Sequence, residues 1–357
     1  MPAALPRQAA GPDAPDDPKR PGHSTHRPPS VAFVVPVWDR LDGCVVATRD
    51  MAHHLRERGA TVEVYSLGPA VYPGATQLCE LADVERGEAY SDLLVTTLYA
   101  TDRLPLEVGG GALTFQRWAV YMHGPSSWPE NPVVRSSVDA WLIPSRAYDW
   151  ERHCPGWPPS RPVVEVEPGF DPRMYPQAGP TGRAGVLVVD GSQQKGGQTV
   201  VRVAGALPDL SFTVVPGGGS SPHPTLFELP NVTILPRQEL DLSPLYRSAS
   251  VLLHPTWSET FGRVLLEAQA SGCPVVCTDL PVLRRTLAGA QFGGDTAAFV
   301  RPRDLPGWIG AIRRLVDERG APREPAWMRL HREGLRSAWT YDPGLCLQPL
   351  WELANGT

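Results

Sequence analysis

Two series of short apolar runs, separated by a stretch rich in proline and glycine, constrain the fold of this 357-residue chain most strongly. The first series opens with the run Val31–Val37, a helix-like stretch at 44–58, and the run Thr61–Leu67. Apolar runs of strand length that alternate with helical segments are typical of parallel sheets covered by helices. This βαβ opening predicts a doubly wound α/β domain.

The remaining runs extend the pattern and repeat it. The first series continues as predicted strands at Leu93–Leu98, Trp118–Met122, Ala140–Ile143 and Val163–Val166. The stretch Pro168–Gly185 is predicted to be a linker because its prolines and glycines interrupt regular structure. The second series has predicted strands at Val186–Val189, Ser211–Val215, Val232–Leu235, Val251–Leu253 and Val275–Cys277, with helices at Gln198–Ala206, 307–319 and 329–353.

Length and composition set the domain plan. A chain of 357 residues with 42% hydrophobic residues is long enough for two domains, each with its own core. We place these domains at 30–170 and 171–328, after a proline-rich tail at 1–29 that is predicted to be disordered. The first strand of neither domain is followed by the GxGxxG pattern of dinucleotide-dependent oxidoreductases, which argues against that class.

Charge and cysteine content exclude other classes. The net charge of −5 argues against nucleic acid as the main partner. No apolar run reaches 18 residues, so no membrane span is predicted, and the N-terminus lacks the apolar core of a secretory signal. The six cysteines form no CxxC pair, which indicates a reducing cytoplasm and no disulfide framework.

The most informative motif is Ser258-Glu-Thr-Phe-Gly, followed by a helical run through Glu267. The backbone N–H groups of Thr260, Phe261 and Gly262 come where a helix begins, and such a terminus suits phosphate. Glu267 is five residues beyond Gly262, roughly 7 Å along a helix, or about one ribose away. The motif therefore suits a nucleotide sugar, although an ordinary amphipathic helix with both glutamates in water has the same spacing.

A second candidate site follows the first strand of the second domain, in Gly191-Ser192-Gln-Gln-Lys195-Gly-Gly197. Small residues let the backbone approach an anion, and Lys195 can neutralise a diphosphate. Lys19 and Lys195 are the only lysines among 33 basic residues, so a lysine here is conspicuous. The alternative is a solvated lysine in a turn.

Two features of the first domain fall where open α/β sheets bind ligands, in loops at the carboxyl ends of strands. His123 follows the predicted strand Trp118–Met122, and Asp42-Gly43 precedes the first helix. His123 could equally be a structural histidine, and Asp42-Gly43 a plain capping turn.

Weaker candidates complete the prediction. Trp38 and Trp128 fall in predicted loops and could stack on an acceptor, because aromatic faces suit flat groups and sugar rings. Arg237 follows a predicted strand and could lie near a nucleotide base. No DxD motif or clustered His/Cys ligand spacing is present in the folded body, so no metal is predicted; Lys195, Arg263 and the helix terminus would handle diphosphate charge.

The basic stretch His53, His54, Arg56 and Arg58 is predicted to be a solvated helix face, with contact to a membrane surface as the alternative.

Together these motifs resemble the retaining GT-B glycosyltransferases, in particular family 4, over most of residues 31–350. Glu259 and Glu267 with Gly272-Cys-Pro-Val-Val resemble the E-x7-E signature of that family. Lys195-Gly196 resembles its K-G turn, and Tyr121-Met-His-Gly-Pro125 its strand-end histidine. The segment 329–357 resembles the terminal helix that packs back on the first domain.

The resemblance implies two Rossmann-like domains that face each other across a cleft, the first binding the acceptor and the second the nucleotide sugar. It implies that Glu267 binds the ribose, that Glu259 and His123 contact the donor sugar, and that Lys195 stabilises the leaving diphosphate. The implied reaction is metal-independent sugar transfer with retention of anomeric configuration.

The sequence departs from the family pattern at the diphosphate site. Gly191-Ser192 stands where the family has Gly-Arg, so one cation is missing, and Arg263 is a candidate to replace it. We expect a cytoplasmic bacterial glycosyltransferase that modifies a small molecule, such as an antibiotic or other natural product. The alternatives are a non-catalytic subunit that binds sugar nucleotides and a GT-B-like epimerase.

Overall fold

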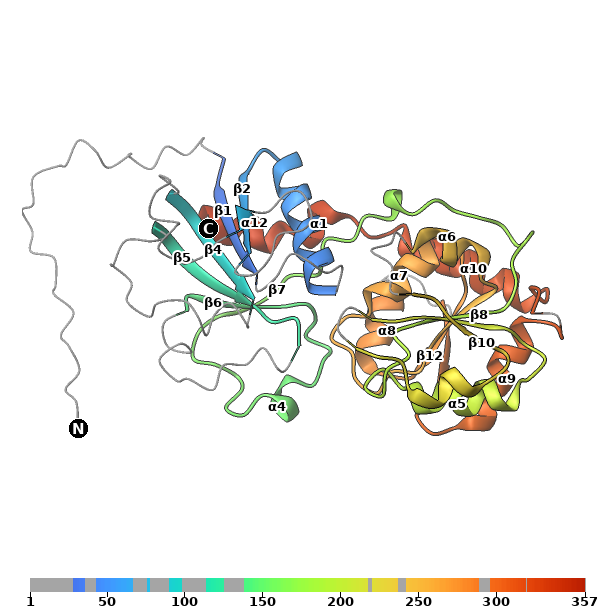
Figure 1. The fold of residues 1–357 in the computed structure, drawn as a ribbon. Coiled ribbons are helices and arrows are strands. Elements are labelled where there is room, and N and C mark those ends of the chain that lie inside the picture. Colours follow the sequence, from blue (N-terminus) through green and yellow to red (C-terminus); the bar gives the residue numbers. More distant parts are fainter. Residues whose placement is uncertain are drawn as a thin grey trace, which may run out of the picture.

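The computed structural model describes residues 28–35, 43–66, 76–77, 90–97, 114–124, 138–217, 220–236, 242–288, 296–318 and 320–356. These residues form two α/β domains, which lie side by side and are joined by two crossing segments (Figure 1). The predicted fold class is therefore confirmed. The predicted tail lies outside the described residues up to position 27.

The first domain is built on a parallel sheet of seven described strands. Across the sheet the order is β3 (Thr76–Gln77), β2 (Thr61–Ser66), β1 (Ser30–Val35), β4 (Tyr90–Thr97), β5 (Thr114–Tyr121), β6 (Ala140–Ile143) and β7 (Val163–Glu165). The order reverses direction between β1 and β4, as in doubly wound sheets.

The second domain has a parallel sheet of six described strands. Their order is β10 (Val232–Ile234), β9 (Phe212–Val215), β8 (Val186–Val189), β11 (Val251–His254), β12 (Val275–Thr278) and β13 (Ala298–Val300). The order reverses between β8 and β11, so these two strands flank the crevice where ligands bind in such sheets.

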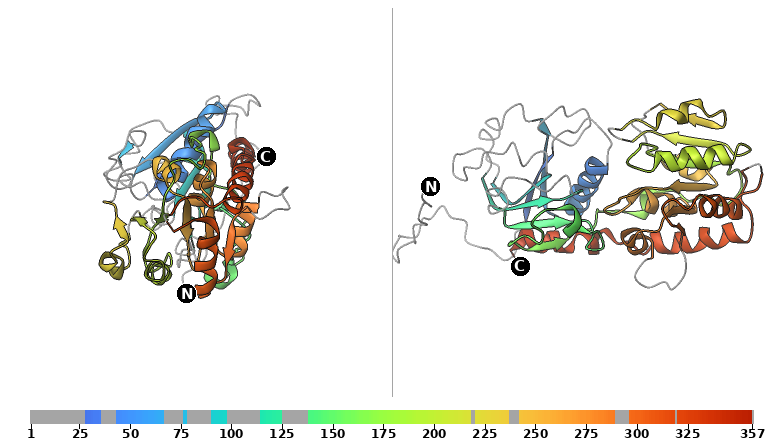
Figure 2. Two further views of the ribbon diagram at one scale, coloured as in Figure 1. Left: turned by 90° about the vertical axis from the view of Figure 1, so that its right-hand side faces the viewer. Right: turned by 90° about the horizontal axis from the view of Figure 1, so that it is seen from below.

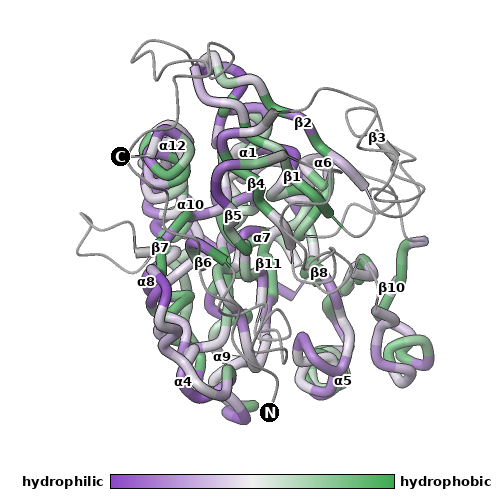
Figure 3. Tube along the Cα trace, turned by 90° about the vertical axis from the view of Figure 1, so that its left-hand side faces the viewer, coloured by the Kyte–Doolittle hydropathy of each residue, from purple (hydrophilic) through white to green (hydrophobic). Residues whose placement is uncertain are grey.

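Alternation of side chains explains why the apolar runs form buried strands. In β1, Phe33 packs with α1 in one core cluster, while its neighbours Ala32 and Val34 pack in the cluster on the other side of the sheet. Residues in a run of this kind are apolar at every position because both faces are covered. In Figure 3 the central strands are accordingly mostly green, whereas the helices carry alternating colours.

The helices cover both sheets. They are α1 (Gly43–Glu57), α4 (Trp150–His153), α5 (Gly197–Ala206), α6 (Ser243–Ser248), α7 (Arg263–Ala270), α8 (Pro281–Ala288), α9 (Leu305–Leu315), α10 (Ala326–Ala338), α11 (Pro343–Cys346) and α12 (Gln348–Asn355), with 3₁₀ turns η3 (Pro172–Met174) and η4 (Pro224–Glu228). Most strands predicted from apolar runs are present with shifted ends, and Ala140–Ile143 and Val186–Val189 have the predicted ends. The strands β3 and β13 were not predicted.

The predicted continuous helix at 329–353 is instead divided among α10, α11 and α12. Pro343 stands at the first turn of α11, where proline is tolerated but cannot continue a preceding helix, and Asp342 caps that turn by accepting from Gly344 N. Residues of α10 pack in the second domain, and Leu350 and Ala354 of α12 pack in the first. The return to the first domain is therefore made by α12, so the C-terminus lies beside that domain (Figure 2). The boundary placed at residue 329 falls inside α10.

Hydrogen bonds of Arg183 attach the predicted linker at Pro168–Gly185 to the second domain. Arg183 is 3% exposed and donates to the carbonyls of Ala178, Gly179, Tyr246, Ala249 and Ser271. One guanidinium thus satisfies buried carbonyls of α6, of the end of α7 and of the linker itself.

The two crossing segments also meet each other. Phe170 of the linker is fully buried, and its ring lies 5.9 Å from that of Tyr341 in the return segment. No described helix is long and apolar enough to cross a membrane.

Candidate functional site

Three polar side chains converge at the carboxyl ends of β8 and β11. Lys195 Nζ lies 2.7 Å from Glu259 Oε2, and His254 Nε2 lies 3.3 Å from the same oxygen. Lys195 comes from the loop after β8, His254 ends β11, and Glu259 lies in the loop that follows. The group therefore occupies the crevice at which the strand order reverses.

Glycines allow these loops to approach closely. Gly196 has φ +82°, and a Cβ atom at this position would come within 2.0 Å of the Pro255 carbonyl oxygen. Gly262 has φ +89° and precedes α7, where a Cβ would meet Leu283 at 2.7 Å. A side chain at Gly196 would thus push the Lys195 loop away from the Glu259 loop.

Neither α5 nor α7 has a side-chain cap, because Gly196 and Gly262 occupy their N-cap positions. The N-terminus of α5 directly follows Lys195, although the Gly197 and Thr199 N–H groups already donate to the carbonyls of Ser192 and Gly196. Helix termini without a side-chain cap favour an anion.

The electrostatics of the Lys195–Glu259 pair favour the ionised forms. Burial by itself raises the pKa of the Glu259 carboxyl, but Lys195 and His254 outweigh it and lower that pKa well below its usual value. Burial opposes the charge on Lys195 as well, yet the Glu259 carboxylate raises the pKa of the amine. A fixed negative charge and a fixed positive charge therefore lie side by side at neutral pH.

The first domain contributes His123, which lies two residues after the end of β5. The Thr260 hydroxyl donates to the His123 carbonyl oxygen at 2.7 Å, which joins the two domains next to Glu259. Burial lowers the pKa of the His123 imidazole to about 3, so the ring is neutral at physiological pH. Its Nε2 atom is buried and has no hydrogen-bond partner in the described part of the chain.

Glu267 lies in a second, more deeply buried group. Its oxygens accept from Arg263 Nε at 2.9 Å and from the Tyr246 hydroxyl at 3.0 Å. Arg263 also bonds to Asp50 on α1 of the first domain, and it lies over the Phe170 ring at 5.9 Å. Despite burial, the acidic groups around Arg263, including Tyr175, Asp50 and Glu267, raise the pKa of its guanidinium.

These contacts settle the position of the candidate replacement cation. Arg263 is engaged with Asp50 and Glu267 and not with Lys195, so in this structure it does not supply the charge expected at Ser192. The interpretation in which both glutamates point into water is also wrong, because the Glu259 and Glu267 side chains are only 13% and 9% exposed.

Several buried polar atoms of these groups have no partner within the described ranges. They are His123 Nε2, His254 Nδ1, Ser192 Oγ and Arg263 Nη1. Buried polar atoms are normally hydrogen-bonded, so a concentration of open ones suits a polar ligand. Others occur elsewhere, for example at Trp308, so the concentration matters only together with the crevice.

The remaining predicted residues are distributed as follows. Gly191 packs against Val214, and Ser192 is 5% exposed with its N–H on Asp190 Oδ1. Gly43 is the first residue of α1. Trp38, Asp42, Trp128 and Arg237 lie outside the described residues.

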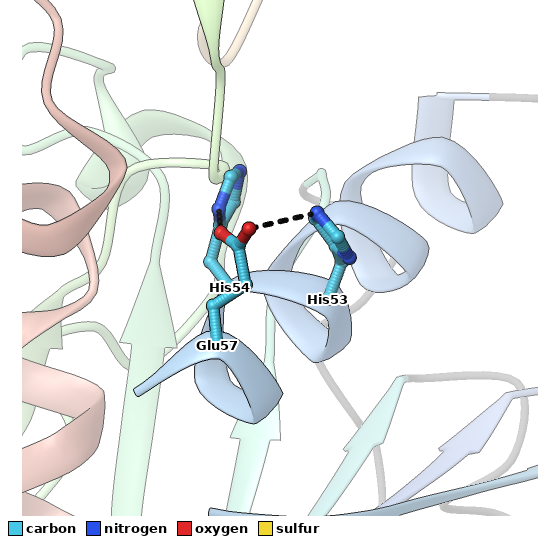
Figure 4. A group of neighbouring side chains, drawn as sticks. All are labelled: His53, His54 and Glu57. Carbon is cyan, nitrogen blue, oxygen red and sulfur yellow. Dashed lines mark hydrogen bonds and ion pairs between the residues drawn. The ribbon is translucent and has the colours of Figure 1, made fainter. Parts of the chain in front are cut away.

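The basic stretch on α1 is not solvated throughout, contrary to the prediction. His54 is buried, and Glu57 lies between the two imidazoles, 3.5 Å from His53 Nε2 and 3.0 Å from His54 Nδ1 (Figure 4). These three residues could hold a metal ion, although the sequence analysis found no clustered ligand spacing. The predicted absence of a ligand cluster considered only histidine and cysteine, whereas the third member of this group is a glutamate one helical turn beyond the histidines.

Sequence reasoning missed His254, Asp50 and Tyr246. His254 ends a strand in the same way as His123, so the same rule would have found it. Asp50 and Tyr246 give no comparable signal, because their partners are distant in the chain.

Comparison with known proteins agrees with this architecture. Residues 186–318 match the family model described as "Glycosyl transferases group 1". The D-inositol 3-phosphate glycosyltransferase of Arthrobacter sp. (strain FB24) is 32% identical over 178 residues, which are 45% of this chain and 41% of that protein. That of Corynebacterium kroppenstedtii is 31% identical over 182 residues, 45% of this chain and 40% of the relative. The chain thus spans about two fifths of the length of these curated relatives.

Solved structures match nearly the whole chain. Anabaena Alr3699/HepE, in complex with UDP and glucose, superposes with a TM-score of 0.70 at 13% identity and covers 92% of this chain and 100% of that one. AviGT4, a glycosyltransferase involved in avilamycin A biosynthesis, gives a TM-score of 0.58 at 19% identity over 92% and 99%. The fold is therefore GT-B, and the second domain is similar in sequence to group 1 glycosyltransferases.

Proposed function

We propose that this protein transfers a sugar from a nucleotide-sugar donor to a small hydroxylated acceptor, with retention of anomeric configuration. The observation that carries the proposal is the Lys195–Glu259–His254 group, which lies in the loops before α5 and α7 and is joined to His123 through the hydrogen bond of Thr260. A cation beside the N-terminus of a helix suits a diphosphate, and polar groups beside it suit sugar hydroxyls.

In the proposed complex the diphosphate lies against Lys195 and the first N–H groups of α7. The ribose hydroxyls bind Glu267, whose carboxylate is held by Arg263 and Tyr246 and retains free lone pairs. The sugar lies between Glu259 and His123. His123 stays neutral, so its Nε2 can exchange a hydrogen bond with a sugar hydroxyl without introducing charge.

Catalysis in this arrangement rests on position and charge. The C–O bond between the sugar and the diphosphate breaks as Lys195 and the α7 terminus stabilise the negative charge that develops on the leaving phosphate. The acceptor oxygen forms a new bond to the anomeric carbon on the face from which the diphosphate leaves, and an oxygen of the leaving phosphate takes the acceptor proton, which gives retention. No metal ion is required in this scheme.

The comparisons support a small acceptor and a UDP-linked donor. The curated relatives carry the name D-inositol 3-phosphate glycosyltransferase, and one structural neighbour belongs to avilamycin A biosynthesis. Another neighbour is in complex with UDP-glucose. A phosphorylated polyol and a natural product are therefore the two acceptor classes to test.

The test has two parts. A thermal-shift panel of UDP, GDP, dTDP and ADP, alone and as sugar conjugates, identifies the donor, because a ligand of the native state raises the melting temperature. Nucleotide release and NMR of the product then establish transfer and anomeric configuration, with and without EDTA.

The alternatives give different results in the same assay. Binding without nucleotide release indicates a non-catalytic subunit, and a changed sugar with donor alone indicates an epimerase. If no nucleotide shifts the melting temperature, the proposed function is wrong.

A further inference from the structure

An exposed tryptophan stands in the loop that carries Glu259. The neighbouring His254 and Thr256 are buried, whereas Trp257 is 52% exposed. The Thr256 hydroxyl donates to the Ser258 carbonyl at 2.8 Å, which fixes the turn that directs Trp257 outward. A single exposed aromatic residue does not by itself indicate a binding site, so the residues around Trp257 must be considered.

The indole is paired with an arginine from another loop. The Arg303 guanidinium carbon lies 5.7 Å from the centroid of the Trp257 ring. Arg303 follows β13 and has φ +69°, a conformation that is uncommon for residues other than glycine. In the described part of the chain no carboxylate forms an ion pair with Arg303, and the adjacent Asp304 caps α9 by accepting from Gly307 N. The side chain thus presents an open cation against an aromatic face.

The order of strands places this pair relative to the donor groups. Lys195 follows β8, Glu259 follows β11, and Arg303 follows β13, while β8 and β13 lie on opposite sides of β11. If the diphosphate lies at Lys195 and the sugar at Glu259, the pair lies on the side of the sugar away from the diphosphate. An acceptor approaching the sugar would occupy that side.

The first domain reaches the same loop. The Tyr148 hydroxyl lies 3.3 Å from Ser258 Oγ, next to Trp257, and the Tyr148 ring stacks on His153 at 5.3 Å. Residues of both domains therefore border the segment in which Trp257 is exposed.

We infer that Trp257 and Arg303 form the second-domain side of the acceptor site, opposite the first domain that is expected to bind the rest of the acceptor, and that this acceptor carries an anionic group such as a phosphate. The indole face packs against the C–H groups of a sugar or polyol ring. The guanidinium offers paired N–H donors, which match phosphate oxygens. This inference rests on the proposed function and adds to it the charge of the acceptor and the residues that select it.

The experiment compares Arg303→Gln, Arg303→Lys and Trp257→Ala with two control variants. Phe227→Ala removes an aromatic side chain that is 66% exposed on η4, and Arg329→Gln removes an exposed arginine on α10. Transfer is measured with inositol phosphate and with inositol as acceptors, and binding of inositol phosphate is measured by calorimetry in the presence of the nucleotide.

Arg303→Gln should raise the KM for inositol phosphate about 10- to 100-fold, as expected for loss of a hydrogen bond to a charged group, and should leave the KM for inositol unchanged. Arg303→Lys should keep part of the preference for the phosphate. Trp257→Ala should raise the KM for both acceptors, and the controls should change neither.

The outcomes separate this inference from the proposed function. Failure of every nucleotide to bind would overturn the proposed function. If nucleotide binds but wild-type protein binds no inositol phosphate, or if Arg303→Gln leaves the preference between the two acceptors unchanged, the inference alone is wrong. The nucleotide-induced shift in melting temperature should be the same in all variants, which shows that they are folded and that the donor site is intact.

Discussion

Glu259 and Glu267 belong to one motif, yet the structure surrounds them differently. Glu259 pairs with Lys195, whose side chain is 31% exposed, and both lie in loops at the crevice. Glu267 lies within α7 and pairs with Arg263, whose side chain is 9% exposed and reaches Asp50 of the other domain. The same residue type thus takes part in one ion pair open to a ligand and in another enclosed between domains.

The difference has a physical consequence. A partly exposed pair can exchange partners for a ligand at modest cost, because water compensates the separated charges. A buried pair cannot, because removal of one member leaves an uncompensated charge. We therefore expect the Glu259 pair to control turnover and the Arg263 guanidinium to control stability and the relative position of the domains. Glu267 keeps its ion pair with Arg263 when a nucleotide binds, and its remaining lone pairs accept from the ribose hydroxyls.

The largest effect is expected from Arg263→Ala. It leaves Glu267 without a cation and Asp50 with the partly exposed Arg49 alone, so the free energy of unfolding should fall by about 3–5 kcal/mol. Chemical denaturation measures this loss, with Arg329→Ala as the control because that arginine is exposed. A loss no larger than that of the control would show that the buried group does not stabilise the fold.

The next effect concerns catalysis. Glu259→Gln keeps the shape of the side chain and removes the charge, so kcat should fall by about 100- to 1,000-fold, as for loss of one preorganised polar group. Glu267→Gln is the matched comparison and should mainly raise the Kd for the nucleotide. Steady-state kinetics and nucleotide titration separate the two, and equal effects of both variants on kcat would remove the distinction between the glutamates.

The smallest effect is a dependence of stability on pH. The folded pKa of Glu259 is below its usual value of 4.5, so its ion pair stabilises the fold above that pH and loses its contribution as the pH falls through the folded pKa. Wild type should exceed Glu259→Gln in stability by about 1 kcal/mol at pH 7, and the difference should shrink below pH 4.5. Thermal melts from pH 7 to pH 3 test this. A difference that grows toward acid would contradict the assigned shift.

Protonation of His123 also lowers stability as the pH falls, over a pH range that overlaps that of Glu259. The folded pKa of His123, about 3, lies below the usual 6.5, so the unfolded chain binds more protons between these values and stability falls as the pH falls. The comparison of Glu259→Gln with wild type removes this shared contribution, since both proteins contain His123.

Much of the fold and part of the site followed from local sequence. Runs such as Val186–Val189 and Ala140–Ile143 are strands with the predicted ends, because a strand buried on both faces must be apolar at every position. Lys195 and Glu259 could be singled out because each belongs to a loop after such a strand. The strand β13 and the division of the last helix at Pro343 were not predicted. The strands β7 and β10 are as short as β13, but each was marked by a run of four residues.

The partners of these side chains depended on the tertiary structure. Arg263 is a neighbour of the motif in sequence and a reasonable candidate for the diphosphate, but its side chain is directed to Asp50, 213 residues away in the chain. The Trp257–Arg303 pair likewise joins two loops that meet only because β11, β12 and β13 are neighbours in one sheet. Periodicity and motif spacing determined which elements form and which loops carry polar groups. Long-range packing alone decided which charges are buried together, because burial sets the energy of a charge and sequence separation carries no information about it.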